Sequence, residues 1–528
     1  MQNLKSGGLI KMNERERIYS DIFERIRCSK KDWMKINSTK QELESLLNGA
    51  FQDDPAYFGM RFIGSTETGH SVKWIRDIDA VLALKPYDSN IFRNRIYSLS
   101  SEIEDLAIRS ARSAVRDIAS GNYRGEHISI IGIEGGHSPL ESLEADVWLH
   151  PDYAKEHLSE SQKRDVVLAK IFFRVLGVPK KHVGCGFTLE QLIVEFGSFD
   201  QMLGAFAKGD PIYIDNSGRY TGEVGPLTVT YPYSGLANLS SQFTEKDLEK
   251  TGKYAKVVLD DPLRFLEDAI SGYNIFMWDQ RANQFGSEAQ YSSPDIYLTQ
   301  RENRTMNRLL RDLGAKRVTD LGCANGFSTL EMTKGLNLEV IGVDSAFGAI
   351  KHARQLAENA GRRDVTYIHG DMIAPEINSD SQDVAIMKRS LGNIPSRRLQ
   401  QKALEEAHRI IIPGGALLVY DSFQEGYSKL SALRERFGVT ALRQPNHTYL
   451  LSEASLRELS SHLFDVEDVR DDTSTYHLIT RVAYPAVMSA LRRDLEKLRF
   501  ASSLHRLSAR LPSIGKFGAS KLYKLRKK

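Results

Sequence analysis

The chain has 528 residues, of which 41% are hydrophobic and 26% charged, with a formal net charge of +3 and three cysteines. This length predicts about three domains, and the globular composition excludes a wholly disordered chain or a coiled-coil rod. The sequence has no apolar run of about 18 residues, no secretory signal, and too few cysteines for a disulfide framework or a cysteine-rich zinc site, so we expect a soluble, cytoplasmic protein without a transmembrane segment.

The first half of the chain predicts a mixed α/β domain followed by helices. The segments YSDIFERIRC and STKQELESLLNGAF have apolar residues at helical spacing, whereas YFGMRFIGS and IDAVLAL are typical of strands. Further along we expect a long helix over about 90–120, strands at HISIIGI and EADVWL, helices over 160–210, and a Gly/Pro/Tyr-rich β-type segment over 211–260.

The predicted strand IDAVLAL follows directly on a pair of aspartates, Asp77 and Asp79. Because alternate side chains of a strand share a face, both carboxylates point the same way, about 7 Å apart along the strand. The other face is covered by Ile78 and the apolar residues in phase with it. Two carboxylates at this spacing suit a pair of Mg²⁺ ions, which would bridge a nucleoside triphosphate and activate an attacking hydroxyl.

Two features extend this candidate metal site. The turn Gly64–Ser65 ends the preceding strand and offers backbone N–H groups and a hydroxyl to phosphates, with glycine permitting close approach. Asp146 lies on the polar side of the predicted strand LEADVWL and would supply a third carboxylate. A lone Asp-x-Asp is usually a solvated strand end, so the prediction depends on the conjunction of these elements.

The run GSTETGHSVKWIRDIDAVLAL resembles the signature of the polymerase-β-type nucleotidyltransferases, and most closely the archaeal-type CCA-adding tRNA nucleotidyltransferases. The run DVVLAKIFFRVLGVPKKHVGCGFTLEQLIVEFGSFDQML resembles the helical neck of that family, and the likeness covers about residues 15–270. By this resemblance Asp77, Asp79 and Asp146 would bind the catalytic metals. The triphosphate would be held by Gly64 and Ser65 and neutralised by Lys170 of the neck.

The chain departs from that family in two respects. Thr68 stands where the family usually has a basic residue, and much of the family's body, with the tail domain that grips tRNA, has no counterpart here. The resemblance therefore implies nucleotide transfer without implying recognition of a whole tRNA.

From about residue 275 strands and helices alternate, which predicts a doubly wound parallel sheet. In RVTDLGCANGFST an apolar strand ends in Asp320, and a turn from Gly322 to Gly326 leads into a helix. This crossing is where such sheets bind nucleotide-like ligands.

The next two predicted strands also end in acids. Asp344 would accept hydrogen bonds from both hydroxyls of a ribose, while Asp371 with Met372 would contact the amine and face of adenine. Each acid alone is equally well explained as a helix N-cap. Three of them at successive strand ends favour a nucleoside-containing ligand.

The stretch 275–485 resembles the class I S-adenosylmethionine-dependent methyltransferases, with WDQRANQFGSEAQYSSPDIYLTQRE as the lead-in helix and RIIIPGGALLVYDSF as the late turn and strand. Ala324 stands where that family commonly has glycine. The resemblance implies that S-adenosyl-L-methionine is bound by Asp320, Gly322, Gly326, Asp344, Asp371 and Met372. The acceptor side carries no Asn/Asp-Pro-Pro-Tyr pattern, and its polar candidates are Lys388, Arg389, Asn393, Asp421, His447 and Tyr476.

The last part of the chain is strongly basic. From Leu491 to Lys528 there are twelve Lys or Arg residues against two acids, and leucines recur at helical spacing. This pattern predicts a basic amphipathic tail that attracts nucleic acid or an anionic surface, or equally a helix docked on the preceding domain.

The predicted fold is thus multidomain α/β, with a mixed-sheet palm, a helical neck and a Rossmann-like domain. Its parts are a nucleotidyltransferase palm over 1–150, a helical neck over 151–210, a small α+β body segment over 211–274, a methyltransferase domain over 275–485 and a basic helical tail over 486–528.

These parts predict a bifunctional enzyme that adds a nucleoside monophosphate from an NTP to a hydroxyl, with two Mg²⁺ ions, and transfers a methyl group from S-adenosyl-L-methionine. The most direct partner is an RNA 3′ end (tRNA-like). The alternatives are a small hydroxyl-bearing acceptor such as a sugar, antibiotic or nucleotide conjugate, and an active methyltransferase with an inactive, RNA-binding palm.

Overall fold

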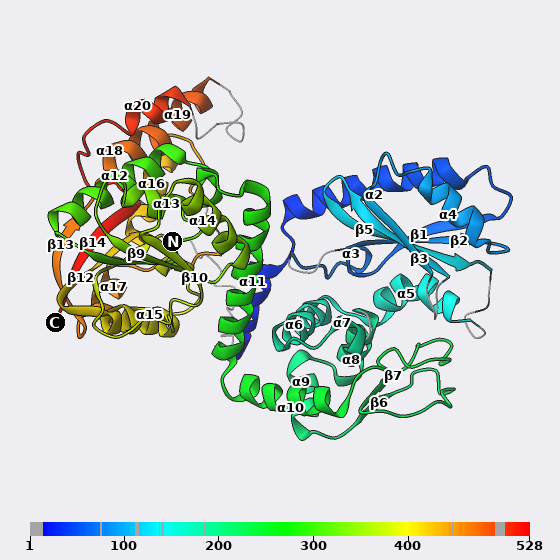
Figure 1. Cartoon of the computed structure of the whole chain (residues 1–528). Helices are drawn as coiled ribbons and strands as arrows, with labels where there is room; N and C mark the ends of the chain where they lie inside the picture. Colours follow the sequence, from blue (N-terminus) through cyan, green and yellow to red (C-terminus); the bar gives the residue numbers. More distant parts are fainter. Residues whose placement is uncertain are drawn as a thin grey trace, which may run out of the picture. The chain divides into compact units, whose positions relative to one another are not determined.

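The computed structural model describes residues 14–73, 77–110, 116–136, 138, 142–183, 186–442, 444–445, 447–491 and 502–528. The chain divides into two compact units, unit 1 (Met1–Ala269) and unit 2 (Ile270–Lys528), and the division falls inside helix α11 (Pro262–Phe285). Each unit has its own main sheet, so the two are described separately (Figure 1).

The main sheet of unit 1 has five strands: β1 (Tyr57–Ile63), β2 (Ile78–Leu84), β3 (Glu104–Ser110), β4 (Asp117–Tyr123) and β5 (Glu126–Glu134). Their order in the sheet is β1-β2-β5-β4-β3. β2 lies parallel to β5 and antiparallel to β1, and β4 is antiparallel to both of its neighbours. The mixed sheet that the sequence predicted is confirmed.

The two faces of β2 pack against different helices. Ile78 and Leu82 belong to a core with α2 (Lys30–Phe51) and α4 (Ser89–Tyr97), whereas Val81 packs with side chains of α5 (Leu143–His157) on the opposite face. Asp79 stands two residues before Val81 in the strand, so its side chain lies on the same face, toward α5. The predicted placement of Asp79 on the face opposite Ile78 is therefore present, and Val81 and Ala83 make the rest of that face apolar as well.

The rest of unit 1 is mainly helical, and a small parallel pair of strands, β6 and β7, completes it. The remaining elements are α1 (Glu14–Ile26), α3 (Ser65–Thr68), α6 (Glu160–Leu176), α7 (Lys180–Val183), α8 (Gly186–Phe196), α9 (Phe199–Lys208), β6 (Ile212–Ile214), β7 (Leu227–Val229) and α10 (Glu245–Asp260).

Three local predictions for unit 1 are wrong in whole or in part. The helix expected over 90–120 ends at Tyr97, and later described residues of that range belong to β3 and β4. The segment LEADVWL is the start of helix α5, where Ser142 accepts a hydrogen bond from the backbone N–H of Glu144 as the N-cap. A short apolar run fits both the helical and the strand periodicity, which explains this error. The β-type segment over 211–260 contains only two short strands and then α10.

Unit 2 contains a seven-stranded sheet of β8 (Arg317–Leu321), β9 (Glu339–Asp344), β10 (Val365–His369), β11 (Gln382–Lys388), β12 (Ile411–Ser422), β13 (Phe464–Arg470) and β14 (Ser520–Lys527). The strand order is β10-β9-β8-β11-β12-β14-β13. β14 runs antiparallel to both neighbours, and the other paired strands are parallel. This topology confirms the predicted doubly wound, Rossmann-like fold.

Helices cover both faces of this sheet, because one core includes side chains of α15 and α17 and another includes side chains of α12 and α14. The helical elements after α11 are η1 (Ala289–Tyr291), α12 (Ile296–Asp312), α13 (Phe327–Met332), α14 (Phe347–Asn359), η2 (Leu391–Asn393), α15 (Arg397–Ile410), α16 (Gln424–Arg436), α17 (Glu453–Ser460), α18 (Ser474–His477), η3 (Leu478–Ala483, a π-helical turn), α19 (Tyr484–Ala490) and α20 (Ser503–Ser508).

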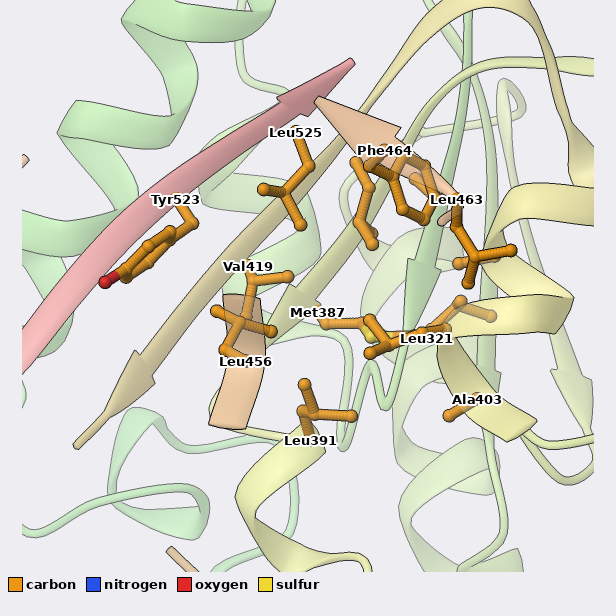
Figure 2. Packing of buried hydrophobic residues seen from close by; sticks show 14 of the residues in the cluster. Leu321, Met387, Leu391, Ala403, Val419, Leu456, Leu463, Phe464, Tyr523 and Leu525 are labelled. Atoms are coloured by element: carbon orange, nitrogen blue, oxygen red, sulfur yellow. The ribbon is translucent and has the colours of Figure 1, made fainter. Parts of the chain in front are cut away.

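The prediction of a separate basic tail is wrong for the end of the chain. β14 lies within the sheet, where Tyr523 and Leu525 join the core that Figure 2 shows. Its basic side chains are paired, since Lys524 lies 2.7 Å from Glu467 and Lys527 lies 2.6 Å from Asp380. In this last segment basic and apolar residues alternate, which is the pattern of a strand. The helical spacing of the leucines earlier in the tail led to the wrong prediction. Residues 492–501 of the predicted tail lie outside the described residues.

In the described part of the chain, no helix is both long enough and apolar enough to cross a membrane.

Candidate functional site

A cavity of about 800 Å³ lies on the α5 face of β2 in unit 1. Its lining includes five of the six residues that the sequence nominated for unit 1, namely Gly64, Ser65, Asp77, Asp79 and Lys170. The fold therefore brings the Gly-Ser turn, the two aspartates and the neck lysine to one place.

The two aspartates have different surroundings. Burial, followed by the neighbouring carboxylate of Asp77, raises the pKa of Asp79. Asp77 instead has two basic side chains nearby, with Nδ1 of His127 at 3.2 Å and Nζ of Lys180 at 3.8 Å. Gly64 lies close to Asp79, because a Cβ added at Gly64 would be 2.6 Å from Oδ2 of Asp79. The backbone φ of Gly64, 72°, also favours glycine.

Asp146 does not join the pair. In helix α5 its buried carboxylate accepts hydrogen bonds from the backbone N–H groups of Tyr233 at 3.0 Å and Ser234 at 3.1 Å. Burial raises its pKa, and those N–H groups oppose the shift. The predicted role as third metal ligand required a strand at this position, and the structure instead uses Asp146 to hold a loop.

The position that faces Asp79 on the neighbouring strand is Ser129 of β5. Ser129 lines the same cavity, and two residues before it His127 pairs with Asp77. Among the described residues no three His, Cys, Asp or Glu side chains are grouped closely enough to hold a metal ion. Sequence reasoning missed Ser129, although it lies in the recognised strand HISIIGI. Pairing that strand with IDAVLAL in parallel would have found it.

Lys170 is anchored by a buried polar chain beneath the cavity. Its Nζ lies 2.7 Å from Nδ1 of His70, whose Nε2 lies 2.8 Å from Glu190. Burial, followed by the charge of Lys170, lowers the pKa of His70 to about 4, so this ring is neutral at physiological pH. A neutral ring accepts from Lys170 at Nδ1 and donates to Glu190 at Nε2. Thr68, at the position that departs from the family pattern, contacts the same ring at 2.7 Å.

In unit 2 a cavity of about 160 Å³ lies at the carboxyl ends of the central strands. Its lining includes five of the six residues nominated for the methyl donor, namely Asp320, Gly322, Asp344, Asp371 and Met372. The sixth, Gly326, is not in that lining. A Cβ added at Gly326 would lie 2.6 Å from Oη of Tyr367, so this glycine lets β10 approach the start of α13.

The carboxylates of Asp320, which is buried, and Asp344, which is partly exposed, differ in their hydrogen bonds. Asp344 accepts from the backbone N–H groups of Ala324 and Ala346, each at 2.9 Å. Asp320 accepts from Oγ1 of Thr329 at 2.6 Å through one oxygen, and its other oxygen, Oδ1, has no partner within the described residues. Burial raises the pKa of Asp320 to about 6. Ala324 has a φ of 55°, so the alanine is strained where the related family has glycine.

Three of the six acceptor-side candidates, Lys388, Arg389 and Asn393, line this cavity. Lys388 is buried and lies 3.2 Å from Glu302, which also pairs with Arg389 at 2.6 Å. Sequence reasoning missed Glu302, because it lies in α12 far from the other motifs and no local pattern marks it. Tyr476 is buried and donates to Asp295 at 2.5 Å, outside the lining of the donor cavity.

The comparisons with known proteins bear on both units. Residues 318–415 match a family model described as a methyltransferase domain. Unit 2 contains a methyltransferase domain. The matched residues run from β8 into β12 and include Asp320, Asp344 and Asp371. A similar solved structure is a geranyl diphosphate C-methyltransferase from Streptomyces coelicolor A3(2), in complex with Mg²⁺, geranyl diphosphate and S-adenosyl-L-homocysteine. Its sequence is 13% identical to this chain, and the TM-score is 0.30. The alignment covers 43% of this chain and 77% of that chain.

The N-terminal half is similar to archaeal proteins named CCA-adding enzyme. The protein from Thermoplasma volcanium is 23% identical over 253 residues, which are 46% of this chain and 56% of the relative. The protein from Pyrobaculum aerophilum is 23% identical over 245 residues, which are 44% of this chain and 57% of the relative. The chain spans about half the length of these curated relatives. The resemblances that the sequence indicated for the two halves are confirmed.

Proposed function

We propose that the chain is a bifunctional transferase. Unit 1 transfers a nucleoside monophosphate from an NTP to a hydroxyl with release of pyrophosphate, and unit 2 transfers a methyl group from S-adenosyl-L-methionine. The observation that carries this proposal is that motif residues distant in the sequence line one cavity in each unit.

The donor set of unit 1 fits a divalent cation that arrives with the nucleotide. Asp77 and Asp79 supply two carboxylates, and Ser129 stands where a third acid would face Asp79. Mg²⁺ is commonly held by one or two carboxylates, with phosphates and water completing its shell. When bound, Mg²⁺ would neutralise the triphosphate and polarise the attacking hydroxyl. We propose one firmly held ion rather than the two expected from three aspartates.

The other residues of this cavity would hold the nucleotide. Gly64 allows the backbone to approach Asp79, and Ser65 presents a hydroxyl at the same edge. Lys170 adds positive charge, and its contact with His70 fixes its position in the cavity wall. A fixed cation stabilises charge on the triphosphate without reorganising during the reaction.

The nucleotide acceptor is a hydroxyl, for which an RNA 3′ end is the first candidate because the relatives are CCA-adding enzymes. A small hydroxyl-bearing molecule is the alternative. RNA binding would weaken steeply with salt through counterion release, whereas binding of a small acceptor would depend little on salt.

The residues of unit 2 fit S-adenosyl-L-methionine, which supplies an electrophilic methyl group. Oδ1 of Asp320 is a buried acceptor without a partner in the described chain, so it fits a cationic or N–H-donating ligand. Asp344 at the end of β9 would accept from ribose hydroxyls, and Asp371 with Met372 would contact adenine.

A second candidate function follows from Ser129. Without a third carboxylate, unit 1 would bind nucleotide or RNA and leave catalysis to unit 2 alone. Incubation of the full chain with each α-labelled NTP, labelled methyl donor, Mg²⁺, and either total RNA or a small-metabolite extract decides between the two. We expect Mg²⁺-dependent incorporation of label that is lost in Asp79→Asn. Methylation without any nucleotide incorporation would favour the second function.

A further inference from the structure

Unit 2 has a second cavity, of about 620 Å³, next to the methyl-donor cavity. The two cavities share four lining residues: Trp278, Ser292, Arg389 and Asn393. A molecule in the larger cavity therefore lies beside whatever occupies the smaller one. The volume is typical of a site for a small organic ligand.

Part of the wall comes from the segment between β13 and β14. Residues 471–519 separate these two strands, and the π-helical turn η3 within them brings Thr480 and Arg481 to the cavity. Helix α16 contributes Tyr427 and Arg434. π-helical turns are often found at functional sites.

The lining is rich in positive charge. Among the described residues, four arginines line the cavity, against one carboxylate, Asp421. Asp421 is buried and accepts hydrogen bonds from the backbone N–H groups of Gly392 and Ser422, each at 2.8 Å. Two of the arginines have carboxylate partners, since Arg389 pairs with Glu302 at 2.6 Å and Arg481 with Asp295 at 2.5 Å.

The other two arginines, Arg281 and Arg434, have no carboxylate partner among the described residues. Arg281 donates to the carbonyls of Tyr291 and Gln290, each at 2.7 Å, and Arg434 donates to the carbonyl of Thr440 at 2.6 Å and to that of Arg481. Carbonyls satisfy N–H groups without neutralising the charge.

Burial lowers the pKa of both guanidinium groups, which shows that the surroundings oppose their charge. A partly buried cation without a counter-charge is unfavourable, and an anion placed beside it relieves that cost. The nearby His447 adds no charge at neutral pH, because burial, followed by the charge of Arg281, lowers its pKa to about 4. The cavity therefore offers two arginines to an anion.

The cavity also has an aromatic wall. Trp278 packs edge-on against His447 with ring centroids 5.6 Å apart, and the guanidinium of Arg281 lies 5.7 Å from the Trp278 ring. A planar ligand with an anionic substituent matches this combination of ring faces and arginines.

We propose that this cavity binds the methyl acceptor, a small planar molecule that carries a phosphate or carboxylate group, through Arg281 and Arg434. The proposal rests on the proposed methyl transfer by unit 2 and names its substrate class. Arg281 and Arg434 are positioning residues for the acceptor.

The test measures binding to the full chain saturated with S-adenosyl-L-homocysteine. Phenyl phosphate and benzoate are compared with their neutral analogues phenol and benzamide by calorimetry, and the two anions distinguish phosphate from carboxylate. Arg281→Gln and Arg434→Gln should each weaken binding of the preferred anion about tenfold or more. Arg434→Lys should retain most of the binding, since it keeps the charge. Arg436→Gln, an exposed arginine on the same helix, is the matched control and should bind as wild type.

The outcomes separate this inference from the proposed function. Failure of the wild-type chain to bind S-adenosyl-L-homocysteine would contradict methyl transfer itself. Normal binding of that compound with equal affinity for phenol and phenyl phosphate, and for benzamide and benzoate, would overturn the anion site alone. In the labelling experiment we expect the methyl label in small anionic molecules, and label found only in RNA would overturn the proposal.

Discussion

The candidate sites of the two units are assembled in different ways. In unit 2, Asp320, Asp344 and Asp371 stand at or just beyond the ends of three strands that are consecutive in the chain and adjacent in the sheet. In unit 1 Asp77 and Asp79 lie at the start of β2, and the residue that faces Asp79 comes from β5, which follows two intervening strands in the chain. The residues of a site at successive strand ends can be inferred from short sequence motifs. The residues of a site in a mixed sheet also depend on which strands pair and in which register.

This difference extends to the chemistry of the acids. Unit 2 keeps a buried carboxylate oxygen of Asp320 without a partner in the described residues. Unit 1 places Ser129 opposite Asp79 and uses Asp146 to bind a loop. We therefore expect unit 2 to bind its cofactor readily and unit 1 to depend on the nucleotide to complete its metal site.

The sharpest test of independence between the units is Asp79→Asn. Removing this carboxylate should reduce nucleotide incorporation about 1,000-fold, because metal-bound charge stabilisation is worth several kcal/mol. The affinity for S-adenosyl-L-homocysteine should stay at the wild-type value, because that cavity lies in unit 2. Incorporation assays and calorimetry on the same preparation measure both. Unchanged incorporation in this variant would remove Asp79 from the mechanism.

The reciprocal change is Asp344→Asn in unit 2. Loss of the charged acceptor should weaken binding of S-adenosyl-L-methionine about tenfold to a hundredfold, the value of one or two charge-assisted hydrogen bonds. Nucleotide incorporation by unit 1 serves as the control and should not change. Equal affinity of variant and wild type would mean that Asp344 only caps the turn at Ala346.

The Asp320 carboxyl gives unit 2 a pH dependence. Its pKa is raised to about 6 by burial, so the folded chain binds more protons at this group than the unfolded chain between about pH 4 and 6. This contribution to the free energy of unfolding decreases as pH rises through that window and is constant above it.

Because S-adenosyl-L-methionine is cationic, it should prefer ionised Asp320. Its affinity should fall about tenfold for each pH unit below 6 and level off above. Calorimetry from pH 5 to 7.5 measures this, and Asp320→Asn should flatten the profile. A flat wild-type profile would place the cationic part of the ligand elsewhere.

Unit 1 can be brought closer to a three-carboxylate site by Ser129→Asp. An acid opposite Asp79 should raise Mg²⁺ affinity in the presence of nucleotide about tenfold, or about 1.4 kcal/mol. Without metal the variant should be less stable, because a third like charge joins Asp77 and Asp79. Ser120→Asp, at the position of β4 that is paired with Ser129 of β5, is a control for added charge. An unchanged Mg²⁺ requirement in Ser129→Asp would argue against metal binding at this strand pair.

The smallest effect on activity is expected for Asp146→Asn. The variant should lose about 1–3 kcal/mol of stability, because two buried backbone N–H groups lose their charged acceptor. Its Mg²⁺ dependence should match wild type. Denaturant unfolding and incorporation at several Mg²⁺ concentrations measure the two properties. Loss of activity in a fully stable variant would restore Asp146 to the metal site.

Several features of the fold could be predicted because they depend on neighbours in the chain. The opposite faces of Ile78 and Asp79 on β2, the helices over 160–210 and the alternation of strands and helices from β8 to β12 follow from periodicity over a few residues. The five cavity-lining residues of each unit belong to motifs of this local kind.

Other features depended on partners distant in the sequence. LEADVWL and the basic C-terminal segment each fit two secondary structures, and packing selected a helix for the first and the strand β14 for the last residues of the second.

The sequence by itself determined that this protein has a strand bearing Asp77 and Asp79 and a Rossmann-like half with acids at successive strand ends. Only the tertiary structure decided that Ser129 rather than Asp146 faces Asp79, that Glu302 joins Lys388 and Arg389, and that β14 enters the sheet. The physical reason is that strand register and burial are set by contacts between segments far apart in the chain, which no local pattern encodes.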